Sequence, residues 1–244
     1  MKNNQERYET ETASKNFEIL ANTIKTWQEE HALALADWQP REHPPYFTFK
    51  SLPESLVIDL WQRLNESLGV ESMIEDLAGE LFTFKENGEL SDQTKLTNLY
   101  FALSGVAHLA RKQVSQELLS PAGENAAGSS CPACGEESRL TILVPPVGKR
   151  YFYCRVCGHE WPGKRLGCII CGSENASKQT YLRFDEFPGV EIAVCEECGE
   201  YFKEIDLRER SPEHFLWEDL QTLPLNFAAE KWLSEQAPKS GNIQ

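Results

Sequence analysis

Hydrophobic residues in the N-terminal half of the chain recur with a helical period. Phe17, Leu20, Ile24, Trp27 and His31 are separated by 3, 4, 3 and 4 positions, which is the spacing of one face of an amphipathic helix. The proline-rich segment DWQPREHPPYFTFKSLP (37–53) follows. Because proline lacks an amide hydrogen and its ring clashes with the preceding turn, we expect this helix to end before the segment.

Three further apolar stripes predict three more helices. The first begins at Ser55, the second at Val70, and the longest covers 92–119, with Ser91 or Asp92 as its N-cap. Their apolar faces would pack together as a bundle, so residues 1–120 are predicted to be an all-helical domain. The small polar residues of PAGENAAGSS (121–130) predict a linker. The stripes consist of Leu56, Leu60 and Leu64; Ile74, Leu77 and Leu81; and Leu96, Leu99, Tyr100, Leu103, Val106, Ala110, Val114 and Leu118.

The pattern changes from helical to strand-like after residue 130. RLTILV, PPVGK and RYFYC (139–154) read as strand, turn and strand, and KQTYLRF, DEFPG and VEIAVC (178–195) repeat that order. The segment between Cys157 and Cys168 has no strand pattern and contains Pro162-Gly163. Two hairpins are therefore expected, with an irregular connector between them.

A last helix is predicted near the C-terminus. Ser211-Pro212 suits an N-cap and first helical position, and Pro224 should interrupt the helix before LNFAAEKW. The predicted fold class is α+β: a helical domain, tandem rubredoxin-like or zinc-ribbon units, and a C-terminal helix. The predicted segments are 1–120, the linker 121–130, the units 131–165 and 166–210, and the helix and tail 211–244.

Eight cysteines supply the candidate chemistry. They form four C-x-x-C pairs, each followed by glycine, and a pair of thiolates on such a turn can chelate one ion at about 2.3 Å. Four pairs in tandem are a strong signal, and the hairpins indicate which pairs join. An interleaved pairing stays open as the alternative. The predicted ligands are Cys131, Cys134, Cys154 and Cys157 for one mononuclear site, and Cys168, Cys171, Cys195 and Cys198 for the other.

Two readings of these sites remain open. A closed four-thiolate site has no free coordination position, so its ordinary role is to stabilise a fold too small to bury a core of its own. The same ligands also suit redox-active iron of the rubredoxin type. The sequence alone does not separate zinc from iron.

The composition indicates which kinds of partner to expect and in which cellular compartment the protein acts. The 244 residues are 41% hydrophobic and carry a formal net charge of -14. Phosphate recognition needs a basic patch, so a nucleic-acid partner is not expected. The N-terminus has no basic segment followed by an apolar one, and no apolar run reaches 18 residues, so we expect a cytoplasmic protein with no integral membrane segment. Reduced thiols in that compartment favour metal sites over disulfides.

The sequence shows few signals of other chemistry. It has no phosphate-binding loop, dinucleotide fingerprint or nucleophile elbow. Among the histidines, His31 and His108 are expected to be ordinary packing or surface residues, and His159 to be solvated beside the thiols. A basic cluster surrounds the cysteine pairs and is expected to balance the thiolate charge, with docking of an acidic partner as the alternative. It consists of Lys149, Arg150, Arg155, Lys164 and Arg165.

These motifs together resemble a known family. Four C-x-x-C-G motifs after a helical region, CRVCGHEWPGKRLGCIICG (154–172), CEECGEYFKEID (195–206) and WEDLQTLPLNFAAEKW (217–232) are similar to the FdhE family of formate dehydrogenase accessory proteins. The resemblance is specific from 131 to about 232. The chain is shorter than typical family members, chiefly at the N-terminus.

The resemblance implies a function. Family members are cytoplasmic factors that formate dehydrogenase needs to become active; they contact its catalytic subunit and are described as rubredoxin-like iron binders. It therefore implies a factor that is not an enzyme, iron as the favoured ion, the eight cysteines as ligands, and Trp161 and Arg165 as family-like positions for partner contact. An electron carrier, a nucleic-acid-binding zinc ribbon and a thiol-exchange factor are the alternatives. The oligomeric state is not indicated.

Overall fold

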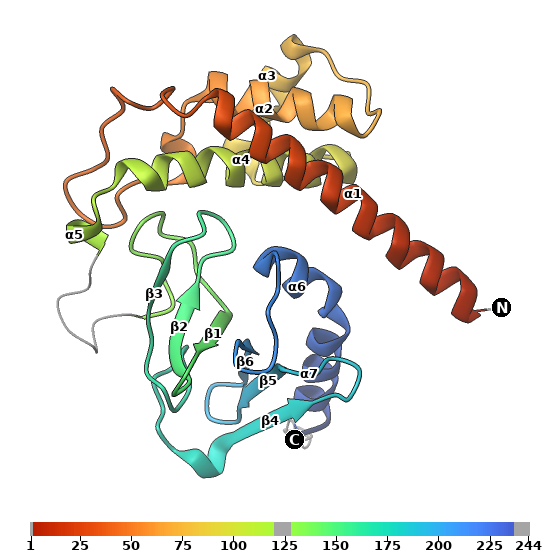
Figure 1. Ribbon diagram of the computed structural model, residues 1–244, viewed down its shortest axis with the longest axis vertical. Helices are drawn as coiled ribbons and strands as arrows, with labels where there is room; N and C mark the ends of the chain where they lie inside the picture. The colour runs from red at the N-terminus through yellow and green to blue at the C-terminus, as the bar shows by residue number, and fades with distance from the viewer. Residues whose placement is uncertain (1, 120–127, 237–244) are drawn as a thin grey trace, which may run out of the picture. The chain divides into compact units, whose positions relative to one another are not determined.

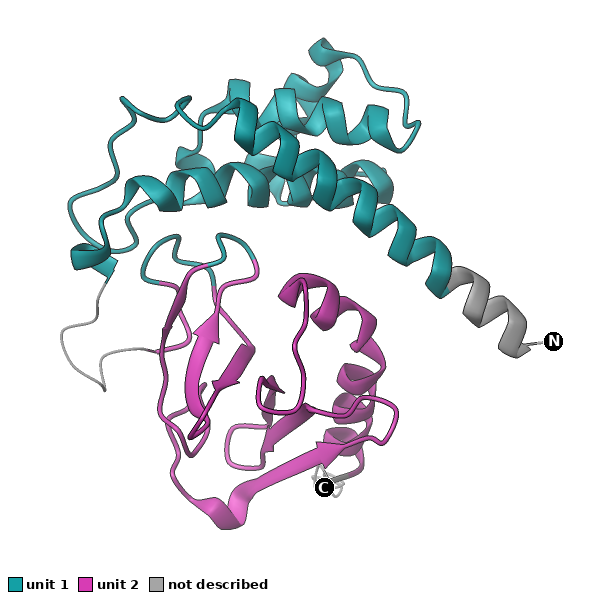
Figure 2. Cartoon of the chain, viewed as in Figure 1, with its two compact units in different colours: residues 1–119, 132–136, 156–158 teal, residues 120–131, 137–155, 159–244 magenta. Residues whose placement is uncertain are grey.

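The computed structural model describes residues 2–119 and 128–236. The chain divides into two compact units, shown in different colours in Figure 2. The helical unit holds residues up to 119 together with 132–136 and 156–158, and the sheet unit holds the rest. Residues 121–127 of the predicted linker and 237–244 of the predicted tail lie outside the described residues.

The helical unit is built from the stripes that the sequence predicts. Its helices are α1 (Lys2–Glu30), α2 (Glu54–Ser67), α3 (Ile74–Asn87), α4 (Gln93–Gln113) and the short α5 (Gln116–Leu119), with a 3-10 turn η1 at Phe49–Ser51 (Figure 1). Trp27 of α1 and both Trp61 and Leu64 of α2 are fully buried. The apolar faces therefore form the core of this unit, but Ile74, Tyr100 and Leu118 of the predicted stripes are exposed.

Gly105 permits a close approach between α4 and its neighbours. A Cβ atom at this position would lie 2.5 Å from Leu60 Cδ2 and 3.2 Å from Ile24 Cγ2. The Gly105 carbonyl also accepts a hydrogen bond of 2.8 Å from Gln28 Nε2. The absence of a side chain thus lets α1, α2 and α4 meet at one point.

Two predicted helix boundaries were wrong. The third helix begins at Ile74 and not at Val70, because the Val70 amide bonds to the Asn65 carbonyl and completes the end of α2, where Gly69 has φ of 68°. The helix predicted over 92–119 breaks at Val114, which is extended. Ser115 then starts α5, since its carbonyl and its hydroxyl accept amide hydrogens of that turn.

Two antiparallel three-stranded meanders make up the sheet. The first consists of β1 (Leu140–Val144), β2 (Lys149–Tyr153) and β3 (Glu160–Pro162), and the second of β4 (Gln179–Arg183), β5 (Val190–Cys195) and β6 (Glu200–Asp206). Both predicted hairpins are present. The connector also contains β3, a strand that the sequence pattern did not predict.

The two meanders join edge to edge. Strand β1 pairs with β6 in parallel, with Thr141 opposite Glu204, so the described strands form one sheet in the order β3-β2-β1-β6-β5-β4. The repeat extends to the third strands: Trp161 on β3 and Phe202 on β6 are both buried. The predicted tandem repeat thus folds as one continuous sheet with a shared centre.

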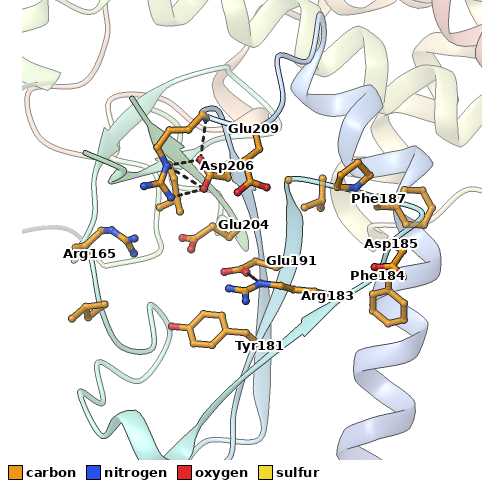
Figure 3. Close-up of a pocket in the computed structure, with 16 residues that line it drawn as sticks. Arg165, Tyr181, Arg183, Phe184, Asp185, Phe187, Glu191, Glu204, Asp206 and Glu209 are labelled. Carbon is orange, nitrogen blue, oxygen red and sulfur yellow. Dashed lines mark hydrogen bonds and ion pairs between the residues drawn. The ribbon is translucent and has the colours of Figure 1, made fainter. Parts of the chain in front are cut away.

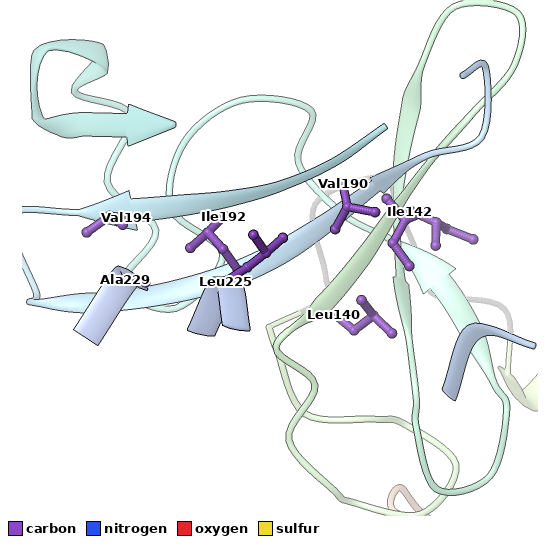
Figure 4. Packing of buried hydrophobic residues seen from close by; sticks show 8 residues of the cluster. Leu140, Ile142, Val190, Ile192, Val194, Leu225 and Ala229 are labelled. Carbon is purple, nitrogen blue, oxygen red and sulfur yellow. The ribbon is translucent and has the colours of Figure 1, made fainter. Parts of the chain in front are cut away.

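Two C-terminal helices accompany this sheet. α6 (Phe215–Gln221) and α7 (Leu223–Gln236) follow β6, and Leu225 and Ala229 of α7 pack on Ile192 and Val194 of β5 (Figure 4). The predicted cap at Ser211-Pro212 was wrong, because α6 begins at Phe215 after an extended His214. The expected interruption near Pro224 is present as the break between the two helices.

A buried ion pair lies where the two meanders meet. Arg150 of β2 and Glu204 of β6 pair on either side of β1, and their side chains are 0% and 2% exposed. Glu204 also accepts a hydrogen bond of 3.0 Å from the Thr141 hydroxyl on β1. Arg150 Nη1 donates to the carbonyls of Lys164 and Gly167, each at 3.1 Å, in the connector between the meanders. One guanidinium group therefore ties three strands and the connector together.

Breaking this pair should destabilise the sheet unit strongly. Arg150→Met would leave the Glu204 carboxylate buried without its cation, which costs about 3–5 kcal/mol in comparable cases. Urea unfolding at fixed metal loading measures the loss. Arg183→Met is the matched control, because Arg183 pairs with Glu191 at the surface, with its side chain 75% exposed, and such pairs contribute about 1 kcal/mol or less.

The double variant Arg150→Met/Glu204→Leu separates charge from packing. Since it removes both charges, it should recover most of the stability that the single variant loses. If Arg150→Met is no more destabilising than the surface control, the pair does not have the role described here.

Candidate metal centres

The structure gathers the eight thiols into two groups of four. Cys131, Cys134, Cys154 and Cys157 form one, and Cys168, Cys171, Cys195 and Cys198 form the other; within each group the sulfur atoms all lie within 4.8 Å of one another. The grouping follows the pairing expected from the hairpins and not the interleaved alternative. Each group consists of the turn before one hairpin and the turn after it.

The second group has the dimensions of a tetrahedral site. The Sγ atoms of Cys168 and Cys198 are 3.8 Å apart, as are those of Cys171 and Cys195. Metal–sulfur bonds of about 2.3 Å in a tetrahedron place neighbouring sulfurs about 3.8 Å apart. The donor set and its spacing therefore fit zinc or rubredoxin-type iron, and do not distinguish between them.

Donors around the second group favour thiolates at some positions. The Ile170 amide donates to Cys168 Sγ at 3.4 Å, and Gln179 Nε2 donates to Cys195 Sγ at 3.3 Å. Burial opposes ionisation of Cys195, but the amides of Cys198 and Glu197 and the Gln179 side chain outweigh it and lower its pKa to about 7. Gln179 opens β4, and no spacing signal in the sequence pointed to it.

Cys168 and Cys198 resist ionisation without an ion. Burial raises the pKa of Cys168 and of Cys198, and the neighbouring thiols Cys171 and Cys168 raise that of Cys198 further. Several thiolates crowded together repel one another, so a divalent or trivalent ion supplies the charge that keeps all four deprotonated.

The first group is enclosed, and residues 132–136 and 156–158 of its turns belong to the helical unit. All four of its thiols are buried. The Ala133 carbonyl accepts from the Phe47 amide at 3.1 Å, and the Val156 carbonyl accepts from the Ser104 hydroxyl at 2.7 Å. Gly158 lies so near His108 that a Cβ atom there would be 2.7 Å from the ring. The ion-binding turns are thus part of the packing of this unit.

The second group is open to solvent by comparison. Cys171 is exposed and Cys198 is partly exposed, whereas Cys168 and Cys195 are buried. A metal ion exchanges, and a thiol reacts, more readily where solvent and reagents reach the sulfur. The two groups share a ligand set but differ in accessibility.

The two candidate partner-contact residues lie in different environments. Trp161 is 1% exposed, stacks on Phe152 with ring centroids 5.0 Å apart, and donates from Nε1 to the Gly128 carbonyl at 3.2 Å. Arg165 is exposed in the connector. Partner contact by either residue remains a prediction, and a buried Trp161 could act on a partner only through the residues it supports.

Three of the five histidines, His31, His108 and His159, take packing positions. His159, expected to be solvated, is buried, and its ring stacks on Trp161 at 5.7 Å. Its carbonyl accepts from the Cys154 amide at 2.9 Å, because β3 follows directly and pulls this turn against β2. His31 stacks on Trp27, and His108 lies against Gly158, in line with the packing roles expected for them.

The basic cluster around the cysteine pairs has carboxylate partners. Arg150 pairs with Glu204, and Lys164 with Glu174 at 2.8 Å. Arg155 pairs at 3.0 Å with Asp219 of α6. The hydrogen bonds and ion pairs found for these three cations are therefore with carboxylates and carbonyls. The side chains of Lys149 and Arg165 form no hydrogen bond or ion pair with the residues that the structure describes.

A second buried ion pair, between a lysine and a carboxylate, holds α6 against β6. Lys203 Nζ of β6 donates to the Asp219 carboxylate at 2.7 Å and to its carbonyl at 2.8 Å. Burial lowers the pKa of Lys203, and Asp219 opposes that effect. Periodicity in the sequence did not reveal Lys203 or Asp219, because a charged residue in a strand or helix normally indicates an exposed face.

The fold and the thiol groups define a class. The chain is an α+β protein that joins a helical unit to a pair of zinc-ribbon-like meanders, each with four thiols suited to one metal ion. None of the helices in 2–119 and 128–236 has the length and hydropathy of a transmembrane span.

Comparison with known proteins finds similar sequences among FdhE proteins. No family model matches the chain. It is 29% identical to Protein FdhE from Escherichia coli over 166 residues, which are 65% of this chain and 50% of that protein. It is 32% identical to an FdhE homolog of Shewanella oneidensis over 39% of this chain and 32% of the relative, and 29% identical to one of Aquifex aeolicus over 43% and 37%.

A solved structure shares the fold. The crystal structure of the FdhE protein from Pseudomonas aeruginosa superposes with a TM-score of 0.60 at 17% identity, covering 88% of this chain and 90% of that one. These similarities confirm the resemblance to the FdhE family. The alignments span at most about half the length of these curated relatives.

Metal removal should proceed in two steps. With zinc bound at both groups, a chelator should take the ion from the second group faster, because Cys171 is exposed while all four thiols of the first group are buried. Zinc release followed with a colorimetric chelator measures both phases. Cys171→Ser should abolish the fast phase and Cys134→Ser the slow one; a single phase unaffected by either variant would contradict this assignment.

Two glycines beside the second group offer a matched test of backbone strain. Gly167 and Gly172 have φ of 90° and 76°, so alanine is strained at either position by about 1–2 kcal/mol. A Cβ at Gly167 would also lie 2.5 Å from the Ser173 carbonyl oxygen, whereas none of the described atoms lies within 4 Å of one at Gly172. Gly167→Ala should therefore lower stability and zinc content at the second group more than Gly172→Ala. Equal losses in thermal unfolding and metal analysis would contradict this.

Proposed function

We propose that this protein is an accessory factor that formate dehydrogenase needs to become active. The observation that carries the proposal is the similarity to FdhE proteins in sequence and fold, together with the two four-thiol groups. The choice of formate dehydrogenase as the partner rests on the family resemblance. The protein would act in the cytoplasm by binding the catalytic subunit before that enzyme is complete.

The metal module would support this role without performing the reaction itself. Each group would use all four of its thiols on one ion, which would leave no coordination position for a substrate. The ligands Cys131, Cys134, Cys154 and Cys157 would keep the first pair of turns folded, and Cys168, Cys171, Cys195 and Cys198 the second. Iron is favoured by the resemblance and zinc is the alternative. On this proposal the protein is a binding factor and not an enzyme.

Exposure of the second group favours one other candidate function. A rubredoxin-type electron carrier needs an iron–thiolate site near the surface, and Cys171 is exposed. Such a carrier would be coloured as purified and would be reduced and reoxidised reversibly. A colourless protein with zinc at both groups would exclude that function.

Complementation tests the main proposal. A bacterial host that lacks its own FdhE-type factor should regain formate dehydrogenase activity when it expresses this chain. An affinity-tagged copy should capture the catalytic subunit from the same cells, and metal analysis of the eluate identifies the ion. A rubredoxin of similar charge serves as the control bait. Neither restored activity nor capture above the control would contradict the proposal.

A further inference from the structure

Two hollows flank the connector between the meanders. One, of about 680 Å³, is lined by Arg165, Leu166 and Tyr181 together with the strands behind them (Figure 3). The other, of about 930 Å³, is lined by the β1–β2 turn and the connector, and also includes Arg165 and Leu166. The connector residues 164–166 therefore form a ridge, the connector ridge, of which Arg165 and Leu166 line both hollows and Lys164 lines the larger one.

The two hollows differ in charge. The smaller one carries a mixture, in which Arg183 pairs with Glu191 and Arg208 with Asp206, while further carboxylates line its wall. The larger one has a single carboxylate in its lining, Glu174, against the exposed cations Lys149, Lys164 and Arg165. The larger hollow is thus cationic on a chain whose formal charge is -14.

Two of these cations are available to a partner. Lys164 is already paired with Glu174, but the Lys149 and Arg165 side chains make no hydrogen bond or ion pair with the described residues. Figure 3 shows Arg165 directed toward the smaller hollow, with no dashed line to the residues drawn. The hydrogen bond from Arg208 lowers the pKa of Asp206, and the charge of Arg165 across the smaller hollow helps to lower it, although Arg165 and Asp206 form no ion pair. In a chain with 38 acidic and 24 basic residues, exposed cations that form no ion pair leave positive charge available to a partner.

Exposed apolar side chains border the same hollow. Val147 in the β1–β2 turn is 71% exposed, and Leu166 on the connector ridge is 69% exposed. Exposed apolar residues beside polar ones are typical of protein-binding surfaces and less so of sites for inorganic anions. Two exposed cations and two exposed apolar side chains therefore surround the larger hollow.

The ridge is rigidly supported from below. Arg150 Nη1 holds the carbonyls of Lys164 and Gly167, and the Gly163 amide bonds to the Arg150 carbonyl at 3.0 Å. A connector anchored at both ends presents Arg165 and Leu166 in a fixed arrangement, which lowers the entropy lost when a partner binds.

We propose that the larger hollow and the connector ridge bind an acidic peptide segment of the partner protein that also carries an apolar side chain. Lys149 and Arg165 would pair with its carboxylates, and Val147 and Leu166 would contact its apolar residue. This deepens the proposed function and rests on it for the identity of the partner, the formate dehydrogenase catalytic subunit. Because exposed pairs are screened, binding would weaken as ionic strength rises.

Charge reversal tests the surface. The variant Lys149→Glu/Arg165→Glu should capture about tenfold less catalytic subunit than the unchanged chain, since it replaces two attractions with repulsions. Lys112→Glu, at an exposed lysine of α4, is the control for added negative charge. For the apolar contact, Leu166→Ser is compared with Leu33→Ser, because Leu33 is 82% exposed outside this surface. Far-ultraviolet circular dichroism and metal content verify that each variant is folded.

A defined probe separates failure of the surface from failure of the proposed function. A fluorescent peptide of alternating aspartate and leucine should bind the unchanged chain and the Lys112→Glu variant, but not the reversed one; a lysine–leucine peptide is the charge control. Loss of both subunit and acidic-peptide binding on reversal supports the proposal. Subunit capture that survives reversal overturns the surface and leaves the proposed function standing.

The other possible outcomes of this experiment also distinguish the proposed surface from the proposed partner. If the unchanged chain captures no catalytic subunit but binds the acidic peptide through Lys149 and Arg165, the surface stands and the proposed partner fails. If it binds neither, the surface is overturned. Retention of single-stranded RNA instead of the acidic peptide by these residues would also overturn the proposal.

Discussion

The buried pair between Arg150 and Glu204 is the constraint on which the sheet unit depends. Neither charge has access to water, so each is tolerated only because the other is present and the remaining hydrogen-bonding atoms are satisfied. The guanidinium also lies over the Phe202 ring at 5.1 Å. Because its other donors bind connector carbonyls, the pair fixes the junction of the two meanders and the loop between the two thiol groups at once.

The two halves of the tandem repeat differ in how far their thiol groups are buried. Both halves contain the same turn–hairpin–turn arrangement with four thiols, yet the first group is enclosed and its turns belong to the helical unit, while the second exposes Cys171. A metal ion at the second group would be accessible to solvent through Cys171, and Cys168 of this group directly follows the connector whose residues form the proposed partner surface.

Much of the site could be predicted because its signals are local. The C-x-x-C-G spacing and the alternating strands on either side of each turn indicated the eight thiols and their grouping. Residues that act through distant contacts left no such signal. Gln179 bonds to Cys195 only because β4 pairs with β5, and Lys203 meets Asp219 only because α6 follows β6 back across the sheet. The burial of His159 likewise depends on β3, whose three residues are too few to show a period.

The sequence by itself determined the helices, the hairpins and the two four-thiol groups, because hydrophobic period, turn residues and ligand spacing act over a few neighbouring positions. Only the tertiary structure decided that the two repeats share one sheet, that Val114 breaks a continuous stripe, and that Arg150 is buried while Arg165 is exposed. Two arginines in one basic cluster look alike along the chain. What separates them is the carboxylate of Glu204, brought to Arg150 from 54 residues away by the parallel pairing of β1 and β6.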